Sequence, residues 1–129
     1  AGSIAPRVME IFASRGIVDK FMKRALELHK EPYTREGIWA GLRPIHYKRI
    51  DSDYKWVLMF AQIETEKLLA EHFRELGGEI RLKSEVTDVA QDAEGVTVTY
   101  RDASGEKTAR SRYLVGADGS NSGVAANEG

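Results

Sequence analysis

A carboxylate, two glycines and a cluster of small polar residues follow one another near the carboxyl end of the sequence. The apolar run Tyr113 to Ala117 predicts a strand, and Asp118 and Gly119 complete a Gly-x-Asp-Gly turn after it. Gly116 and Gly119 permit backbone conformations or close approaches that a side chain would block. Open α/β sheets bind ligands at the carboxyl ends of their strands, so this turn is a candidate ligand site. The alternative is a tight strand-to-helix turn that binds nothing.

The sequence lacks the spacing motifs of metal sites, nucleophilic catalysis and phosphate-binding loops. The three histidines, His29, His46 and His72, form no pair at metal-ligand spacing, so we expect no metal site. The absence of cysteine excludes disulfides and thiolate nucleophiles within this chain. There is no Gly-x-Ser-x-Gly elbow, Gly-x-Gly-x-x-Gly turn or Walker loop. An NAD-dependent dehydrogenase is therefore a weak interpretation, because its dinucleotide fingerprint is missing.

The composition is typical of one globular domain or part of one. The 129 residues include 19 basic and 20 acidic ones, and the net charge of -1 gives no general attraction to nucleic acid or anionic membranes. The longest apolar stretch, Trp56 to Ala61, is too short to cross a bilayer. We therefore expect neither a nucleic-acid nor a membrane partner, and we predict a cytoplasmic location.

Two kinds of periodicity predict the elements that must position these residues. Apolar residues at helical spacing predict a helix after Pro6, a second over about Val18 to Leu28, and a third that ends at Gly77-Gly78. Between the second and third helices, glycine and proline residues divide the chain into short strands at Ile38 to Ala40, Ile45 to Tyr47 and Trp56 to Phe60.

After residue 78 the period changes to two, which predicts strands. They are expected at Glu79 to Leu82, Glu85 to Gln91, around Val96 to Tyr100, and Thr108 to Arg112, with turns that link an antiparallel meander. We predict an α+β fold of helices, an antiparallel meander and short strands. It forms a single partial domain over residues 1–129, helical at 1–30, with short strands at 31–60, a helix at 61–78 and a sheet at 79–119.

Three segments together resemble FAD-dependent aromatic-ring hydroxylases of the para-hydroxybenzoate hydroxylase type. Residues 1–12 resemble the helix that follows the flavin-contacting arginine, residues 60–69 resemble a strand-glutamine-helix segment, and residues 113–119 resemble the Asp-Gly motif. Order and spacing agree, and the likeness covers residues 1–122. The resemblance implies a fragment of an α/β FAD-binding fold, whose short strands at 31–60 form a substrate wall.

The resemblance implies cofactor-binding roles for particular positions. Gln62 matches the glutamine that hydrogen-bonds the flavin chain, and an amide suits this role because it can donate and accept at once. Its alternative role is a cap of the following helix. Ala1, Gly2 and Ser3 match the loop that passes close to the cofactor, where small residues leave room.

The same resemblance implies the remaining site residues and the reaction. Asp118 and Gly119 match the motif near the cofactor pyrophosphates. FAD is the implied cofactor, NAD(P)H the reductant, and a small aromatic compound the substrate that is hydroxylated with oxygen. The candidate substrate contacts are Trp39, Leu42, His46, Tyr47 and Trp56. Core packing is the alternative for each of them.

The family's glycine-rich phosphate turn would precede this sequence, and its second Gly-Asp motif would follow it. We therefore expect an internal piece of a monooxygenase, or a degenerate relative, that neither binds FAD tightly nor turns over alone. With apolar faces uncovered, such a piece should form a homodimer, swap elements or be marginally stable. The alternative is a stand-alone α+β ligand-binding or interaction module without redox activity.

Overall fold

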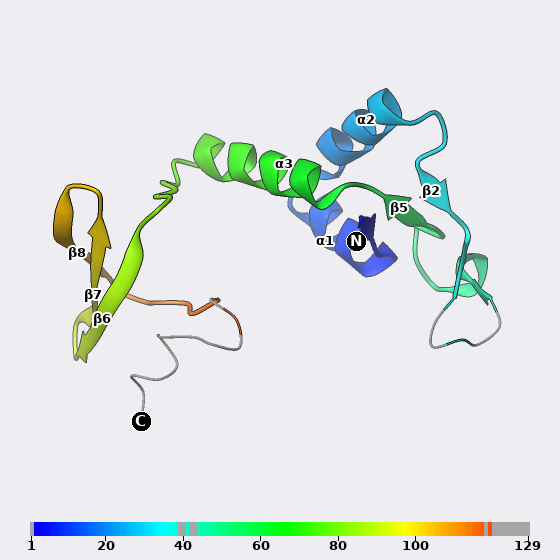
Figure 1. The fold of residues 1–129 in the computed structure, drawn as a ribbon. Coiled ribbons are helices and arrows are strands. Elements are labelled where there is room, and N and C mark those ends of the chain that lie inside the picture. Colours follow the sequence, from blue (N-terminus) through cyan, green and yellow to red (C-terminus); the bar gives the residue numbers. More distant parts are fainter. Residues whose placement is uncertain (1, 39–40, 42–43, 118, 120–129) are drawn as a thin grey trace. The chain divides into compact units, whose positions relative to one another are not determined.

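The computed structural model describes residues 2–38, 41, 44–117 and 119 (Figure 1). Their contacts form two compact units, Ala1–Ile80 and Arg81–Gly129, and each is described by itself. The elements of the first unit are β1 (Ser3–Ile4), α1 (Pro6–Ser14), α2 (Val18–Leu28), β2 (Tyr33–Thr34), β3 (Glu36–Gly37), β4 (Ile45–His46), the 3-10 helix η1 (Tyr47–Arg49), β5 (Val57–Met59) and α3 (Gln62–Glu75). The second unit contains β6 (Glu85–Asp92), β7 (Gly95–Asp102) and β8 (Gly105–Ser111).

The core of the first unit forms between α1, α2 and the strand β5. Proline suits the first turn of α1, and Gly16 ends that helix region with a φ of 70°, a left-handed conformation that glycine adopts readily. Phe21 of α2 packs between Phe12 of α1 and Phe60, with ring centroids 4.3 Å and 5.6 Å away. The other buried members of this cluster are Ile4, Met9, Ile17, Ala25 and Leu58.

Two small sheets complete the first unit. β5 is the central strand of an antiparallel sheet of order β1-β5-β2, in which Ser3 pairs with Met59 and Tyr33 pairs with Leu58. β3 and β4 form a separate antiparallel pair. The first sheet therefore holds the amino terminus of the chain against the strand that leads into α3.

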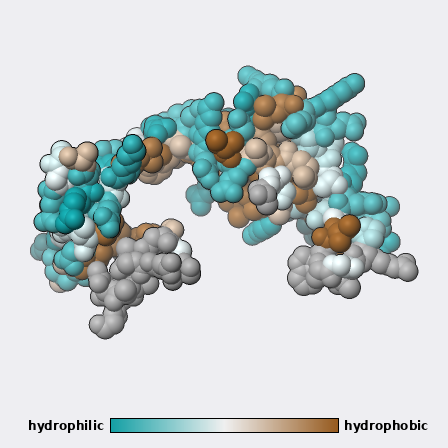
Figure 2. Space-filling view, viewed as in Figure 1, coloured by the Kyte–Doolittle hydropathy of each residue, from teal (hydrophilic) through white to brown (hydrophobic). Residues whose placement is uncertain are grey.

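α3 is the predicted third helix, but its apolar stripe is largely exposed. None of its residues is buried among the described ones, and only Leu68 packs against the core cluster. Ile63 and Leu76 are both mostly exposed. Figure 2 shows hydrophobic residues, coloured brown, that reach the surface between hydrophilic ones over the helical unit.

The second unit confirms the predicted meander. β6, β7 and β8 form one antiparallel sheet with β7 in the centre. Val96 and Tyr100 of β7 are buried, as the alternation of apolar and polar residues predicts. Gly95 and Gly105 begin β7 and β8 directly after the two turns.

Two strand predictions are wrong. Residues 79–82 and 113–117 form no strand, because a strand needs a hydrogen-bonded neighbour and no described segment pairs with either. Of the strand expected at Ile38 to Ala40, only Ile38 is described, and it follows the end of β3 at Gly37; residues 39–40 lie outside the described residues. Among the described residues, no helix combines the length and apolar character that crossing a membrane requires.

Candidate functional site

Three of the predicted cofactor-binding residues lie where β1 pairs with β5 and the chain passes from β5 into α3. The backbone N–H of Phe60 donates to the carbonyl oxygen of Gly2 over 3.0 Å. Ser3 pairs with Met59 in the adjacent register position. Gln62 begins α3 directly after this ladder. The sheet therefore brings Gly2 and Ser3 to the amino end of the helix that carries Gln62.

The approach of the two backbones at Gly2 depends on its missing side chain. A Cβ atom there would lie 2.8 Å from the carbonyl oxygen of Phe60 and 3.2 Å from the Cα of Ala61. Both neighbours are backbone atoms, so they cannot swing aside as a flexible side chain could. The glycine thus leaves a surface of main-chain groups beside the start of α3.

The amino end of α3 offers hydrogen-bond donors that no side chain caps. The N-cap residue Ala61 has no side-chain acceptor, and its carbonyl oxygen accepts from the backbone N–H groups of Glu64 and Thr65 over 3.0 Å and 3.1 Å. The N–H groups of Gln62 and Ile63 precede this ladder, where helix geometry provides no acceptor. Such groups, together with the helix dipole, favour an anionic ligand.

The Gln62 side chain is exposed and lies along the helix surface. Its Nε2 donates to Oε1 of Glu66 over 2.8 Å, and its carbonyl oxygen can still accept. The amide does not cap α3, since the structure shows no side-chain cap at this end. The alternative role as a cap is therefore wrong.

One acidic residue lies in the first turn of α3, and it is paired. Oε2 of Glu64 accepts from Nε of Arg24 in α2 over 2.7 Å. This hydrogen bond lowers the pKa of Glu64 and raises that of Arg24. The first turn of α3 thus holds an ionised carboxylate whose charge is balanced from a neighbouring helix.

This arrangement fits a nucleotide cofactor. Phosphate groups need donors, and the start of α3 supplies backbone N–H groups for them. Ribose-like hydroxyl groups need partners that both donate and accept, and the Gln62 amide supplies both functions. Gly2 leaves room for a close approach to the main chain.

The remaining predicted cofactor residues are Ala1, Asp118 and Gly119. Ala1 and Asp118 lie outside the described residues. Gly119 belongs to the second unit and has a φ of 83°, the left-handed conformation expected of a glycine in a tight turn. The roles of Asp118 and Gly119 near the cofactor pyrophosphates stay predictions.

The described part of the first unit contains three of the predicted substrate contacts, His46, Tyr47 and Trp56. Trp39 and Leu42 lie outside the described residues. Trp56 packs against the core cluster, with its ring centroid 5.4 Å from that of Tyr33. His46 lies in β4, where its Nδ1 is 3.0 Å from Oε1 of Glu36. The contacts of Trp56 agree with the alternative, in which it packs in the core. Among the described contacts, that of His46 with Glu36 gives no evidence of a substrate role.

Tyr47 lines a cavity that the sequence pattern did not indicate. The cavity has a volume of about 480 Å³ and lies between the start of α1 and the segment around η1. Its wall residues are Ala5, Pro6, Arg7, Glu10, Ile45, Tyr47, Ile50, Asp51 and Ser52. These residues are about 40 positions apart in the chain, so only the folded structure brings them together.

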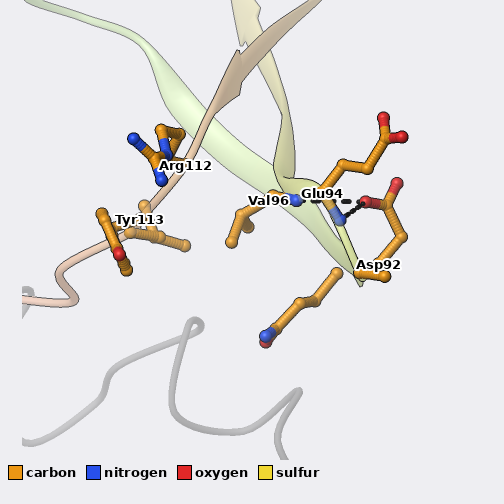
Figure 3. Close-up of a pocket in the computed structure, with 9 residues that line it drawn as sticks. Asp92, Glu94, Val96, Arg112 and Tyr113 are labelled. Atoms are coloured by element: carbon orange, nitrogen blue, oxygen red, sulfur yellow. Dashed lines mark hydrogen bonds between the residues drawn. The ribbon is translucent and has the colours of Figure 1, made fainter.

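The second unit contains a smaller pocket of about 360 Å³. Figure 3 shows Arg112 and Tyr113 on one side of it and Asp92, Glu94 and Val96 on the other. The Asp92 carboxylate already accepts from the backbone N–H of Glu94 over 2.8 Å. It has a structural role in the turn between β6 and β7.

Across the ranges that the structure describes, no group of three His, Cys, Asp or Glu side chains could hold a metal ion. Nδ1 of His72 is buried on α3, 3.5 Å from Oε2 of Glu75. The described part of the site therefore consists of backbone donors, one amide and one ion pair.

Known proteins resemble this chain over almost its whole length. The model of a family described as FAD binding domain matches residues 1–129. A rifampicin monooxygenase of Streptomyces venezuelae is 39% identical over 118 residues, which cover 92% of this chain and 23% of that protein. The solved structure of OxyS anhydrotetracycline hydroxylase from Streptomyces rimosus is 33% identical, with a TM-score of 0.83 over 95% of this chain and 24% of OxyS.

A third similar protein is the flavin-dependent monooxygenase PieE, whose structure was solved in complex with FAD and substrate. It is 29% identical, with a TM-score of 0.74 over 99% of this chain and 25% of PieE. The chain thus spans about a quarter of the length of these relatives. Because the match to the family extends over every residue, the chain belongs to the FAD-binding domain family.

Proposed function

We propose that this chain contributes part of the flavin site of a monooxygenase that hydroxylates a small aromatic substrate with NAD(P)H and oxygen. The observation that carries the proposal is the junction of Gly2, Ser3 and Gln62, where main-chain donors and an exposed amide lie together. Membership in the FAD-binding domain family supports it. So do relatives named as monooxygenases of rifampicin and anhydrotetracycline.

Bound FAD would supply the redox chemistry, and the residues of this chain would bind and orient it. Gln62 exchanges hydrogen bonds with the flavin chain through its amide. The first N–H groups of α3 face an anionic part of the cofactor. Gly2 and Ser3 let the main chain pass close to it. Ala1, Asp118 and Gly119 are proposed as further cofactor contacts, the last two near the pyrophosphate.

The aromatic substrate is proposed to lie against Trp39, His46 and Tyr47. The cavity beside Tyr47 supports a contact there, because its lining combines apolar side chains with a phenol. Small aromatic compounds and NAD(P)H are the small-molecule partners we propose, and the net charge of -1 provides no general attraction for nucleic acid. We also propose a cytoplasmic location, because NAD(P)H is available there.

The change of Gln62 to Leu, made in the longest natural polypeptide that contains this chain, tests the cofactor role. We expect Gln62→Leu to weaken FAD binding by about 3- to 10-fold, because hydrogen bonds to the amide are lost. Flavin fluorescence quenching measures this affinity. Glu71→Gln, an exposed position on the same helix, serves as the matched control and should leave the affinity unchanged.

A second measurement, the rate of NAD(P)H oxidation, distinguishes the proposed enzyme from a ligand-binding module without redox activity. A monooxygenase should oxidise NAD(P)H faster when its aromatic substrate is added. A polypeptide that binds an aromatic compound but neither FAD nor NAD(P)H would contradict the proposal.

A further inference from the structure

The first turn of α3 carries a negative charge close to the proposed cofactor. Glu64 follows Gln62 by two positions, in the turn whose N–H groups would face an anionic part of FAD. An unbalanced carboxylate there would repel phosphate groups and compete with them for the same donors. FAD binding at this end of α3 therefore requires that Glu64 be held aside and its charge balanced.

Arg24 meets both requirements. Its Nε donates to Oε2 of Glu64 over 2.7 Å, across 40 positions of sequence. The two side chains are 34% and 20% exposed, so solvent screens this pair less than it screens a fully exposed one. A second contact, from NH1 of Arg24 to Oε2 of Glu27 over 3.4 Å, keeps the guanidinium on α2.

We propose that Arg24 is a positioning residue for FAD: it holds Glu64 against α2, and so keeps the first N–H groups of α3 available to the cofactor. The inference rests on the proposed function, because it assumes that FAD binds at this end of the helix. Arg24 itself need not touch the cofactor. Its effect passes through the charge and position of Glu64.

The same two helices provide a matched control. Nζ of Lys20 in α2 donates to Oε2 of Glu75, the last residue of α3. This second ion pair joins the same elements as the first, but at the opposite end of α3 from Gln62. A purely structural contribution of interhelical ion pairs should therefore appear in both pairs alike.

The test compares Arg24→Met with Lys20→Met in the longest natural polypeptide that contains this chain. We expect Arg24→Met to weaken FAD binding by roughly 10-fold, because the unbalanced Glu64 carboxylate then repels the cofactor phosphates, and Lys20→Met to change it by less than about 2-fold. Fluorescence quenching gives the dissociation constants. Thermal unfolding of the FAD-free protein shows whether the two changes cost similar stability.

A third variant distinguishes charge from packing. When Glu64→Gln is added to Arg24→Met, the unpaired carboxylate disappears, and FAD binding should recover to within about 3-fold of the wild type. If Arg24 acted only by joining α2 to α3, binding would not recover, because Glu64→Gln does not restore the hydrogen bond between the two helices.

The inference is overturned if Arg24→Met and Lys20→Met weaken FAD binding equally, or if Glu64→Gln fails to restore it. If the wild type binds FAD and Arg24→Met binds it equally well, the inference is refuted but the proposed function is not. A wild-type protein that binds no FAD would refute the proposed function, and the inference with it.

Discussion

Gly2 has no side chain, and this allows the backbone around Gly2 to lie close to the backbone at Phe60 and Ala61 in the candidate site. Replacing it with alanine would drive a Cβ atom to within 2.8 Å of the Phe60 carbonyl oxygen. We expect Gly2→Ala to lower the free energy of unfolding by about 1–3 kcal/mol, as overpacking does, and to weaken FAD binding. Chemical denaturation of the full natural polypeptide measures the first effect and fluorescence quenching the second.

Ser3→Ala is the matched control for this change, because the neighbouring Ser3 side chain is exposed. It should leave the unfolding free energy unchanged within about 0.5 kcal/mol. Equal stabilities of Gly2→Ala and the wild type would show that the junction can open without cost, and that the close approach is not required.

Asp92 gives the second unit a defined dependence on pH. The guanidinium of Arg110, and after it the backbone N–H of Glu94, lower the pKa of Asp92 from 3.8 to about 2. A carboxyl group with a depressed pKa in the folded state stabilises above its unfolded pKa, and this stability is lost as pH falls through the folded value. The contribution of Asp92 should therefore be complete above about pH 4 and disappear toward pH 2.

The change of Asp92 to Asn should remove this part of the pH dependence. Thermal unfolding of the wild type and of Asp92→Asn between pH 5 and 2 should show melting temperatures that converge as the pH falls. Glu94→Gln is the control, because this exposed carboxylate lies 4.0 Å from Arg110 and takes no part in the turn through its side chain. A constant difference between wild type and Asp92→Asn over this range would contradict the assignment.

Among the elements, the β-strand β5 matters most to the candidate site. It pairs with β1 on one side and β2 on the other, and the chain passes from it into α3. Leu58 is 0% exposed, whereas its neighbour Met59 is 48% exposed on the other face. The strand thus anchors Gly2 and the start of α3 to the core through alternate side chains.

Two substitutions in β5 test this anchoring. Leu58→Ala should lower the free energy of unfolding by about 2–5 kcal/mol, because it leaves a cavity in the core. Met59→Ala should cost less than about 1 kcal/mol, since much of this side chain is already in water. Denaturant titration of both variants provides the comparison, and similar losses would mean that the face of β5 toward Met59 is covered in the natural protein.

The elements also show where sequence patterns succeed. α2 spans Val18–Leu28 as predicted, and α3 ends just before Gly77, because helical hydrogen bonds join residues four positions apart. The predicted strand at 113–117 has the right apolar residues but no partner among the described ones. Strand formation depends on a neighbour elsewhere in the chain, and local periodicity does not supply it.

For the molecule as a whole, uncovered apolar side chains are the property with the largest consequence. In the first unit, Ile38, Ile63 and Leu76 are exposed, and in the second unit Tyr113 and Val115 are exposed. Leaving a few hundred Å² of apolar surface in water forfeits several kcal/mol at about 25 cal/mol per Å², an amount comparable with the net stability of a domain.

We therefore expect residues 1–129, produced alone, to form dimers or larger assemblies, or to unfold at low denaturant concentration. Sedimentation velocity over a range of concentrations, with urea titration, measures both outcomes. FAD should not bind tightly to this polypeptide. A compact, highly stable monomer would show that the exposed apolar side chains are tolerated.

The sequence by itself determined the helices, the meander and the position of Gln62 at the start of a helix, because these depend on neighbours a few residues away. It also carried the resemblance that the family match confirms. Only the tertiary structure decided that Gly2 lies against Ala61, that Arg24 balances Glu64, and that Tyr47 borders a cavity with the start of α1. Each of these contacts joins segments roughly 40 or more positions apart. Such contacts depend on how the elements pack, and local periodicity carries no information about which distant side chains will meet.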